Sequence, residues 1–202
     1  MAPILLVVVA YLIGSISFAV VVSWCFSLPD PHTYGSGNPG ATNVLRTGKK
    51  AAAAFTLIGD AAKGAIALWL ARRWAAEFDV GQITLAAVAF AAFIGHLFPA
   101  YFRFKGGKGV STAAGILLAL DVRIAGVVLL AWLLTVLASR YSSLGAIMAA
   151  LVAPVATLYF LGWGPFVWMV LAMSVLLLWR HCANIERLIN GTESRIRLSR
   201  GT

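Results

Sequence analysis

The sequence predicts an all-α integral membrane protein with about seven transmembrane helices, two short or horseshoe-like central segments, the N-terminus outside and the C-terminus cytoplasmic. Composition gives the first reason: hydrophobic residues make up 61% of the chain and charged residues 11%, whereas about a quarter of the residues in a soluble domain are charged. The mean hydropathy of +0.89 agrees with this. Apolar runs recur along the whole chain, so we expect residues 1–202 to form one integral membrane domain.

Seven apolar runs place the expected spans at about 3–23, 53–71, 82–100, 110–120, 124–138, 144–161 and 166–180. The first run has no preceding basic residue and no small-residue cleavage site, so we expect a retained span rather than a signal peptide. The fourth and fifth runs are too short to cross about 30 Å of hydrocarbon as straight helices. We expect them to be tilted, broken or paired as a horseshoe.

The distribution of basic residues predicts the orientation of these spans. With seven crossings, twelve of the sixteen basic residues fall on one side of the membrane, which is the pattern of cytoplasmic loops. These twelve are Arg46, Lys49, Lys50, Arg103, Lys105, Lys108, Arg140, Arg180, Arg187, Arg195, Arg197 and Arg200. The opposite side keeps three arginines near acidic residues: Arg72, Arg73 and Arg123, beside Glu77, Asp79 and Asp121. Fusing the fourth and fifth runs would place the arginine-rich tail outside, so we expect two segments there.

A glycine-rich segment with the sequence GSGNPGATNVLR follows the first span, from Gly35 to Arg46. Its glycines permit positive φ and close backbone approach, and such loops expose N–H groups to phosphate oxygens. The glycines and the hydrogen-bonding residues are Gly35, Ser36, Gly37, Asn38, Gly40, Thr42 and Asn43. Arg46 follows at a distance suited to a bidentate anion contact. An ordinary turn-rich connection would not explain two asparagines and an arginine in twelve residues, so we expect an anion-binding loop.

A second polar segment, GHLFPAYFRFKGGKGVST, runs from Gly95 to Thr112. Three glycines and two lysines gather near its end, at Lys105, Gly106, Gly107, Lys108 and Gly109. The composition suits a phosphate, because each charged hydrogen bond contributes about 1.5–3 kcal/mol. The Walker pattern is absent, because Gly109 follows the lysine and no strand precedes it, so nucleotide hydrolysis is not supported. Lysines that only anchor the lipid interface would leave the interleaved glycines unexplained.

Two further polar segments fall on the same predicted side. The loop SRYSS holds Arg140 and Ser143, and the segment HCANIERLINGTE begins at His181. Within that segment His181 and Asn184 are three residues apart and share a helical face. They could supply a proton relay and an oxyanion donor, or they could bind phosphate or cap neighbouring helices. Glu186 and Glu193 are expected to stabilise the tail by pairing with arginines.

Charged residues also occur inside the apolar runs. Asp60 and Lys63 stand three residues apart in the second span, where charges are costly and are usually paired or functional. We expect an internal ion pair that shapes the cytoplasmic cavity. A lone His96 near the end of the third span is expected to be a structural group. Cys25 and Cys182 lack metal-ligand spacing, so we expect no metal site and no cofactor.

The three long segments that begin at Gly35, Gly95 and His181, taken in this order, resemble one family: the bacterial acyl-phosphate-dependent glycerol-3-phosphate acyltransferases. The resemblance covers Tyr11 to about Glu193. It implies transfer of a fatty acyl group from acyl phosphate to the sn-1 hydroxyl of glycerol 3-phosphate, giving lysophosphatidic acid and phosphate, the first committed step of phospholipid synthesis. It also implies the bacterial cytoplasmic (inner) membrane, with the active site on the cytoplasmic face. The HxxxxD motif of acyl-CoA-dependent acyltransferases is absent from the sequence.

The family's functional residues can be placed on this chain through these motifs. The expected catalytic residues are Ser36, Arg46, Lys105, His181 and Asn184. The expected substrate-binding residues are Gly35, Gly37, Asn38, Gly40, Thr42, Asn43, Gly106, Gly107, Lys108, Gly109, Arg140 and Ser143. Because acyl phosphate has a good leaving group, direct attack by the glycerol hydroxyl is expected, without an acyl-enzyme. The base is either His181 or an oxygen of the donor phosphate, and we favour the substrate-assisted route.

Other function classes fit the sequence less well. A membrane carrier for phosphate esters would need polar residues along both halves of a path, and the first motif has no inverted repeat. A structural subunit that recruits a soluble partner would explain the basic tail but not the inner loops. The net charge of +9 does not indicate nucleic-acid binding, because the basic residues are interleaved with lipid-length apolar runs. Expected partners are the lipid bilayer and, at the tail, a soluble enzyme that produces acyl phosphate.

Overall fold

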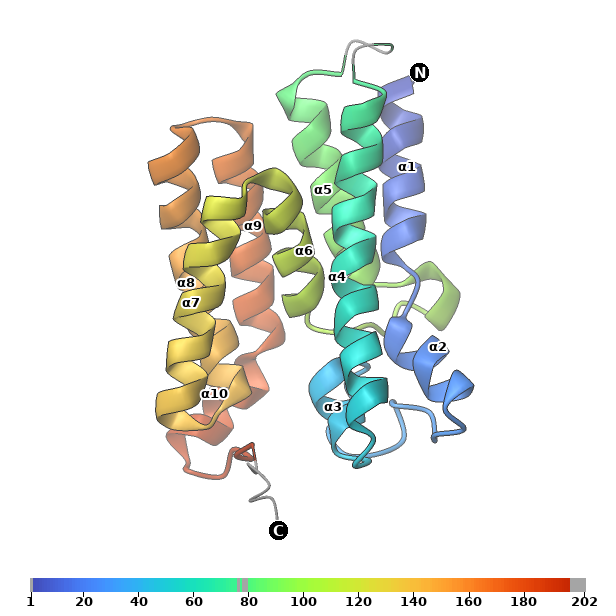
Figure 1. Cartoon of the computed structure of the whole chain (residues 1–202), viewed down its shortest axis with the longest axis vertical. Coiled ribbons are helices and arrows are strands. Elements are labelled where there is room, and N and C mark those ends of the chain that lie inside the picture. The colour runs from blue at the N-terminus through green and yellow to red at the C-terminus, as the bar shows by residue number, and fades with distance from the viewer. Residues whose placement is uncertain (1, 76, 78–79, 197–202) are drawn as a thin grey trace.

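The computed structural model describes residues 2–75, 77 and 80–196, and the regular structure in them is helical. The helices are α1 (Ala2–Gly14), α2 (Phe18–Cys25), α3 (Ala41–Leu45), α4 (Lys50–Arg73), α5 (Gln82–Leu97), η1 (Ala100–Phe102), α6 (Val110–Leu120), α7 (Val122–Ser139), α8 (Ser142–Leu161), α9 (Pro165–Arg180) and α10 (Cys182–Ile189). Figure 1 shows the long helices side by side, with the start of α1 and the end of α10 at opposite ends of the bundle.

Four of these helices are long and apolar enough to cross a membrane: α4, α5 with η1, α7 and α8. Six spans result if each of two bent pairs, α1 with α2 and α9 with α10, counts as one span. The all-α fold and the presence of several apolar spans are therefore confirmed. Seven crossings and the orientation of the termini stay predictions. Asp79, Arg197 and Arg200, which the charge count used, lie outside the described residues.

The first predicted span is broken in the structure. We expected one helix over 3–23, but α1 and α2 meet at a bend of 41°. Gly14 at the end of α1 lies against the backbone of Ala92 in α5, where a side chain would not fit. Beyond the break, Lys63 Nζ donates to Ile16 O at 2.6 Å. A lysine from α4 therefore satisfies a carbonyl that the broken helix leaves open.

The two central segments differ from each other in length. The fourth segment is the eleven-residue α6, short as predicted. The fifth was predicted to be short as well, and this was wrong: α7 has 18 residues, about 27 Å at about 1.5 Å per residue. The helix starts two residues earlier than predicted, where the Asp121 side chain accepts a hydrogen bond from Arg123 N at 2.8 Å and caps the start of α7. At the end of α6, Arg72 donates to the carbonyls of Ala119 and Leu120.

Small residues allow the helices to approach closely, and apolar side chains cover the outside. A side chain at Gly64 or Gly115 would collide with α6 or α4, so this helix pair packs almost backbone to backbone. The largest of the apolar core clusters has members from each of the helices α4, α5, α6, α7, α8 and α9, and it includes Phe93, Ile116 and Ile124, each fully buried. The lipid-length α7 is mostly exposed along its leucines, as expected for a helix that faces hydrocarbon.

The polar segments gather in one half of the bundle. In Figure 1, α3, α10 and the turn between α7 and α8 lie at the end opposite the N-terminus. The loop that follows η1 turns back within the height of the bundle and leads into α6. Segments far apart in the sequence are thus brought to one region.

Candidate functional site

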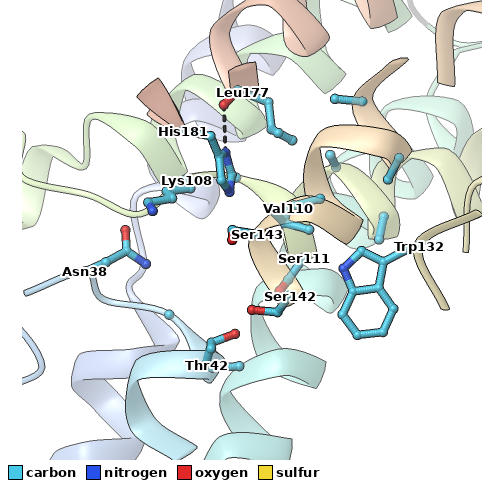
Figure 2. Close-up of a pocket in the computed structure, with 18 of the residues that line it drawn as sticks. Asn38, Thr42, Lys108, Val110, Ser111, Trp132, Ser142, Ser143, Leu177 and His181 are labelled. Atoms are coloured by element: carbon cyan, nitrogen blue, oxygen red, sulfur yellow. Dashed lines mark hydrogen bonds between the residues drawn. The ribbon is translucent and has the colours of Figure 1, made fainter. Parts of the chain in front are cut away.

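A cavity of about 730 Å³ begins among the polar segments and continues between α6, α7, α8 and α9. Polar side chains that line it include Ser36, Asn38, Thr42, Arg46, Asp60, His96, Lys108, Ser143, His181, Asn184, Arg187 and Glu193. Its apolar part is lined by Leu117, Val128, Leu129, Trp132, Ala146, Ala150, Val170, Met173 and Leu177, among others. Figure 2 shows Asn38 and Lys108 on one side of the His181 ring and Trp132 on the other. One cavity therefore joins a cationic part to an apolar groove.

The first loop is held together by Asn43, which is 2% exposed. Its Oδ1 accepts from Ser36 N at 3.0 Å, and its Nδ2 donates to the carbonyls of Pro31 and Tyr34 at 2.9 and 3.1 Å. Gly35 has a φ of +59° and leaves no room for a side chain beside Asn43. The amide of Asn43 is thus used within the loop, and the loop presents Ser36 to the cavity.

The glycine-rich loop of the second segment is fixed from two sides. Gly107 N donates to the carbonyl of His96 at 3.1 Å. From the other side, Arg180 Nε donates to Gly107 O at 3.1 Å and Arg180 Nη2 donates to Gly106 O at 2.6 Å. Gly109, with a φ of +87°, then starts α6. Between these fixed glycines the Lys108 ammonium donates to Asn184 Oδ1 at the cavity wall.

His181 lies just beyond the α9 span and is 3% exposed. Its Nδ1 is 2.8 Å from Leu177 O, as Figure 2 shows. Because a carbonyl oxygen can only accept, Nδ1 carries the proton and Nε2 is the nitrogen left for another partner. Burial, assisted by the charges of Lys108 and Arg180, lowers the pKa of His181 to about 4, against the hydrogen bond to Leu177. The ring is therefore neutral at pH 7.

Glu193 is a site residue that sequence reasoning placed among surface pairs. Its Oε1 accepts from Ser143 Oγ at 2.8 Å and from Asn184 Nδ2 at 2.6 Å. Its Oε2 accepts from Arg187 Nε at 2.7 Å. The predicted pairing of Glu193 with an arginine is confirmed, but the carboxylate lies at the cavity wall and ties α8 to α10. The position of Glu193 at the end of the HCANIERLINGTE motif was the signal that could have found it.

The chain beyond α10 crosses the mouth of the cavity. Ser194 Oγ accepts from Arg46 Nη2 at 2.7 Å, which links this segment to the first loop. Ile196 N donates to the carbonyl of Arg140 at 2.8 Å, and Arg195 Nε donates to the Tyr141 hydroxyl at 3.0 Å. The segment therefore links the first loop to the turn between α7 and α8.

The cations of the site affect one another. Burial, with the charges of Arg187, Arg180 and Arg46, lowers the pKa of Lys108 to about 8, and Glu193 opposes this shift. Repulsion of this kind raises the affinity of a site for an anion, because an added anion relieves it. The cluster is consequently suited to phosphate groups.

Most of the predicted site residues are brought together. Eleven of them line this cavity: Ser36, Asn38, Gly40, Thr42, Asn43, Arg46, Lys108, Gly109, Ser143, His181 and Asn184. Gly35, Gly37 and Gly106 line a second cavity of about 620 Å³ that shares Ser36, Asn38, Arg46 and Lys108 with the first. Lys105, Gly107 and Arg140 line neither. The carbonyl of Lys105 instead lies 3.1 Å from His32 Nε2. Arg180 and Arg187, which border the second cavity, were not among the predicted site residues.

The described residues of this region do not form a set of side chains typical of a metal site. Across residues 2–75, 77 and 80–196, no group of three or more His, Cys, Asp or Glu side chains is placed to hold a metal ion. The site instead offers guanidinium, ammonium, amide and hydroxyl donors. Such donors bind anionic oxygen.

Comparison with known proteins agrees with this chemistry. Residues 4–191 match the family model described as glycerol-3-phosphate acyltransferase. The chain is 55% identical over 198 residues to the glycerol-3-phosphate acyltransferase of Burkholderia lata, covering 97% of this chain and 92% of the relative. It is 53% identical over 196 residues to that of Paraburkholderia phymatum, covering 97% and 93%.

Two solved structures share the fold. Both are of PlsY (YgiH), an integral membrane glycerol 3-phosphate acyltransferase, in its glycerol 3-phosphate and lysophosphatidic acid forms. Each is 34% identical to this chain, with TM-scores of 0.90 and 0.89, and the matches cover 98% of this chain and 96% of the other. A match over nearly the whole length, in sequence and in fold, shows that the chain belongs to the glycerol-3-phosphate acyltransferase family.

Proposed function

We propose that this membrane acyltransferase moves a fatty acyl group from acyl phosphate to the sn-1 hydroxyl of glycerol 3-phosphate, releasing lysophosphatidic acid and inorganic phosphate. One observation carries the proposal: a single cavity joins the cationic cluster around Arg46 and Lys108 to an apolar groove that ends among α6, α7, α8 and α9. The two ends of an acyl phosphate match the two parts of this cavity. Its phosphate is anionic and its chain is apolar.

The cationic part of the cavity offsets the main obstacle to this reaction, which is the charge repulsion between the two substrates. Two phosphate-bearing substrates must meet at one carbonyl carbon, and their charges repel one another. Arg46, Lys108 and Arg187 converge on this part of the cavity, and preorganised cations and donors offset that repulsion. Ser36 and Ser143 add hydroxyl groups that orient phosphate oxygens. Since Lys105 lies elsewhere, Lys108 takes the ammonium role in this proposal.

The chemical step needs no acyl-enzyme. The glycerol oxygen attacks the acyl carbon, the new ester C–O bond forms, and the bond from that carbon to the phosphate oxygen breaks. The hydroxyl proton goes to an oxygen of the departing phosphate, which leaves as hydrogen phosphate. His181 is a poor alternative base, because its pKa is about 4 and a general base works best when its pKa is near the operating pH. We assign its Nε2 to binding.

A single-turnover pH profile of His181→Gln tests this assignment. We expect weaker substrate binding with a chemical step that keeps its pH dependence, because the proton acceptor belongs to the donor. Collapse of the chemical step with unchanged substrate binding would show that His181 is the base.

The positive-inside distribution of basic residues supports a cavity mouth on the cytoplasmic face of the bacterial inner membrane. The groove between lipid-facing helices gives a membrane-soluble chain a place next to that mouth. A soluble enzyme that makes acyl phosphate could deliver its product to this end, where Arg187 and Arg195 lie. Accessibility of single engineered cysteines to a membrane-impermeant thiol reagent in oriented vesicles measures the sidedness.

The donor is tested with purified protein, glycerol 3-phosphate and either acyl phosphate or acyl-CoA. We expect phosphate release and lysophosphatidic acid to appear in equal amounts with acyl phosphate, and no transfer from acyl-CoA. Equal rates with acyl-CoA would overturn the donor. A carrier is not favoured, because the described charged residues at the opposite end, such as Arg72 and Arg123, do not line the cavity.

A further inference from the structure

We propose that Asp60, Lys63 and His96 form a buried positioning cluster, which sets the place of the Gly106–Gly109 loop and thereby of Lys108 in the glycerol 3-phosphate site. The inference rests on the proposed function, because its readout is the affinity for that substrate. None of the three residues needs to touch substrate. Their role is to hold the loop that does.

The cluster begins with an ion pair inside the bundle. Lys63 Nζ lies 2.8 Å from Asp60 Oδ1, and the two residues are 2% and 1% exposed. The predicted internal ion pair is therefore confirmed. Lys63 Nζ also donates to Ile16 O at the break between α1 and α2. Buried charges stay in place only when paired and hydrogen-bonded, so this pair fixes α4 against the broken helix.

His96 extends the cluster toward the loop. Its Nδ1 lies 3.6 Å from Asp60 Oδ1. The other edge of the ring faces Gly107: a Cβ at that position would overlap Nε2 and lie 2.9 Å from Cε1. The His96 carbonyl also accepts from Gly107 N at 3.1 Å. Ring and backbone of one residue thus support the same glycine.

The position of the His96 ring sets the position of the Lys108 ammonium, because the loop between them is held on both sides. Arg180 binds the carbonyls of Gly106 and Gly107, as described above, while His96 supports Gly107 from the bundle side. Lys108 is the next residue. A shift of the ring into or away from the loop therefore moves the ammonium relative to Asn184, its partner at the cavity wall.

The His96 ring is itself not fully hydrogen-bonded. His96 Nδ1 is a buried atom without a hydrogen-bond partner in the described structure. Asp60 Oδ1, which pairs with Lys63, lies 3.6 Å from it, and both residues border the cavity. Leaving such atoms unpaired is costly. A small rotation of the ring gives Asp60 and His96 a direct hydrogen bond, and this fixes the ring edge that faces Gly107.

The test is the Michaelis constant for glycerol 3-phosphate in purified variants. We expect His96→Ala to raise this KM about tenfold, with kcat and the KM for acyl phosphate changed less than about threefold. His96→Asn keeps an N–H donor near the Nδ1 position and should recover most of the affinity. The double variant Asp60→Asn with Lys63→Met removes the buried charges together, so it should fold while showing the same selective rise in KM.

A double-mutant cycle between His96 and Gly107 isolates the contact. Gly107→Ala should raise the KM strongly in the wild-type background and much less beside His96→Ala, because the added methyl then occupies the vacated ring space. Effects that multiply in the cycle, or a loss of kcat and thermal stability with no selective change in KM, would overturn the positioning role. If the wild-type protein itself fails to use acyl phosphate and glycerol 3-phosphate, the proposed function fails instead.

Discussion

The arginines at the two ends of the bundle differ in what they bind. At the end nearer the N-terminus, Arg72 donates to carbonyls at the end of α6, and Arg123 pairs with Asp121 at 2.7 Å and lies over the Phe160 ring. At the other end, Arg46 donates to a serine hydroxyl and Lys108 to an amide oxygen. The first group completes helix ends, whereas the second keeps its charge available to a ligand.

This difference shows why net charge alone is a poor guide to function. Both ends carry basic residues. Arg46 and Lys108 belong to glycine-rich segments and line both of the cavities described above, whereas Arg72 and Arg123 line neither of them. A cation paired with a carboxylate adds little attraction for a second anion. A cation paired with a neutral group keeps most of it.

Arg46→Ala should give the largest effect, a fall in kcat/KM of about 100-fold, because two charge-assisted hydrogen bonds contribute about 1.5 kcal/mol each. Arg46→Lys keeps the charge but not the two-pronged geometry, so we expect an intermediate loss. Arg123→Ala, at the other end, is the matched control and should leave kcat/KM near wild type. A similar loss in both arginine variants, measured by phosphate release, would remove the contrast between the ends.

The pH dependence of substrate affinity sharpens the role of Lys108. Its pKa of about 8 lies below the ordinary value for lysine, so the cation is present below that pH and is lost as the pH rises through it. At pH 9 about one molecule in eleven keeps the charge, and the KM for glycerol 3-phosphate should rise about tenfold from its value at pH 7. Lys108→Arg should remove this rise. A flat KM between pH 7 and pH 9 in the wild type would contradict it.

The apolar groove can be tested separately from the cations. Ala150 lines the groove and is 4% exposed, whereas the next residue, Leu151, is 51% exposed on the outside of α8. Ala150→Phe should lower kcat/KM for long-chain acyl phosphates several-fold relative to short-chain ones, because the ring fills the groove. Leu151→Phe should leave the ratio unchanged. A chain-length ratio that is the same in both variants would show that the acyl chain lies elsewhere.

Glu193→Gln should give the smallest effect, a loss of stability with a modest change in activity. Burial raises the pKa of Glu193, but the donors Ser143, Asn184 and Arg187 outweigh it and lower the pKa. The carboxylate therefore stabilises the fold above its unfolded pKa, and this is lost as the pH falls through the lower folded value. We expect Tm in detergent to fall by about 5 °C at pH 7 and the difference from wild type to close on acidification. A constant difference at every pH would indicate a steric effect.

Much of the site could be predicted because its chemistry is local in sequence. The loop around Ser36 and the glycines around Lys108 combine residue types that a simple membrane turn does not need, and these residue types predict an anion-binding site. The Asp60 and Lys63 pair was predictable for the same reason, since a helix places residues three apart on one face. The all-α fold followed from apolar runs of spanning length.

Other features depend on how the backbone turns and where side chains point, and the spacing of residues in the sequence does not determine this. Arg103 and Phe104 take positive φ values of 52° and 60°, which glycine usually adopts, and Lys105 after them does not line the cavity. Arg140 also has a positive φ, of 64°. The role of Glu193 required knowing that the chain folds back after α10. The contact between His96 and Gly107 joins two residues of one motif whose packing only the folded structure reveals.

The most direct test of the account is a structure of this protein with glycerol 3-phosphate bound. We predict a phosphate within hydrogen-bond distance of Arg46 and Lys108, about 3 Å, and the sn-1 hydroxyl pointing toward the apolar groove near Trp132. A phosphate held at Arg72 or Arg123, or a hydroxyl facing away from the groove, would contradict the account.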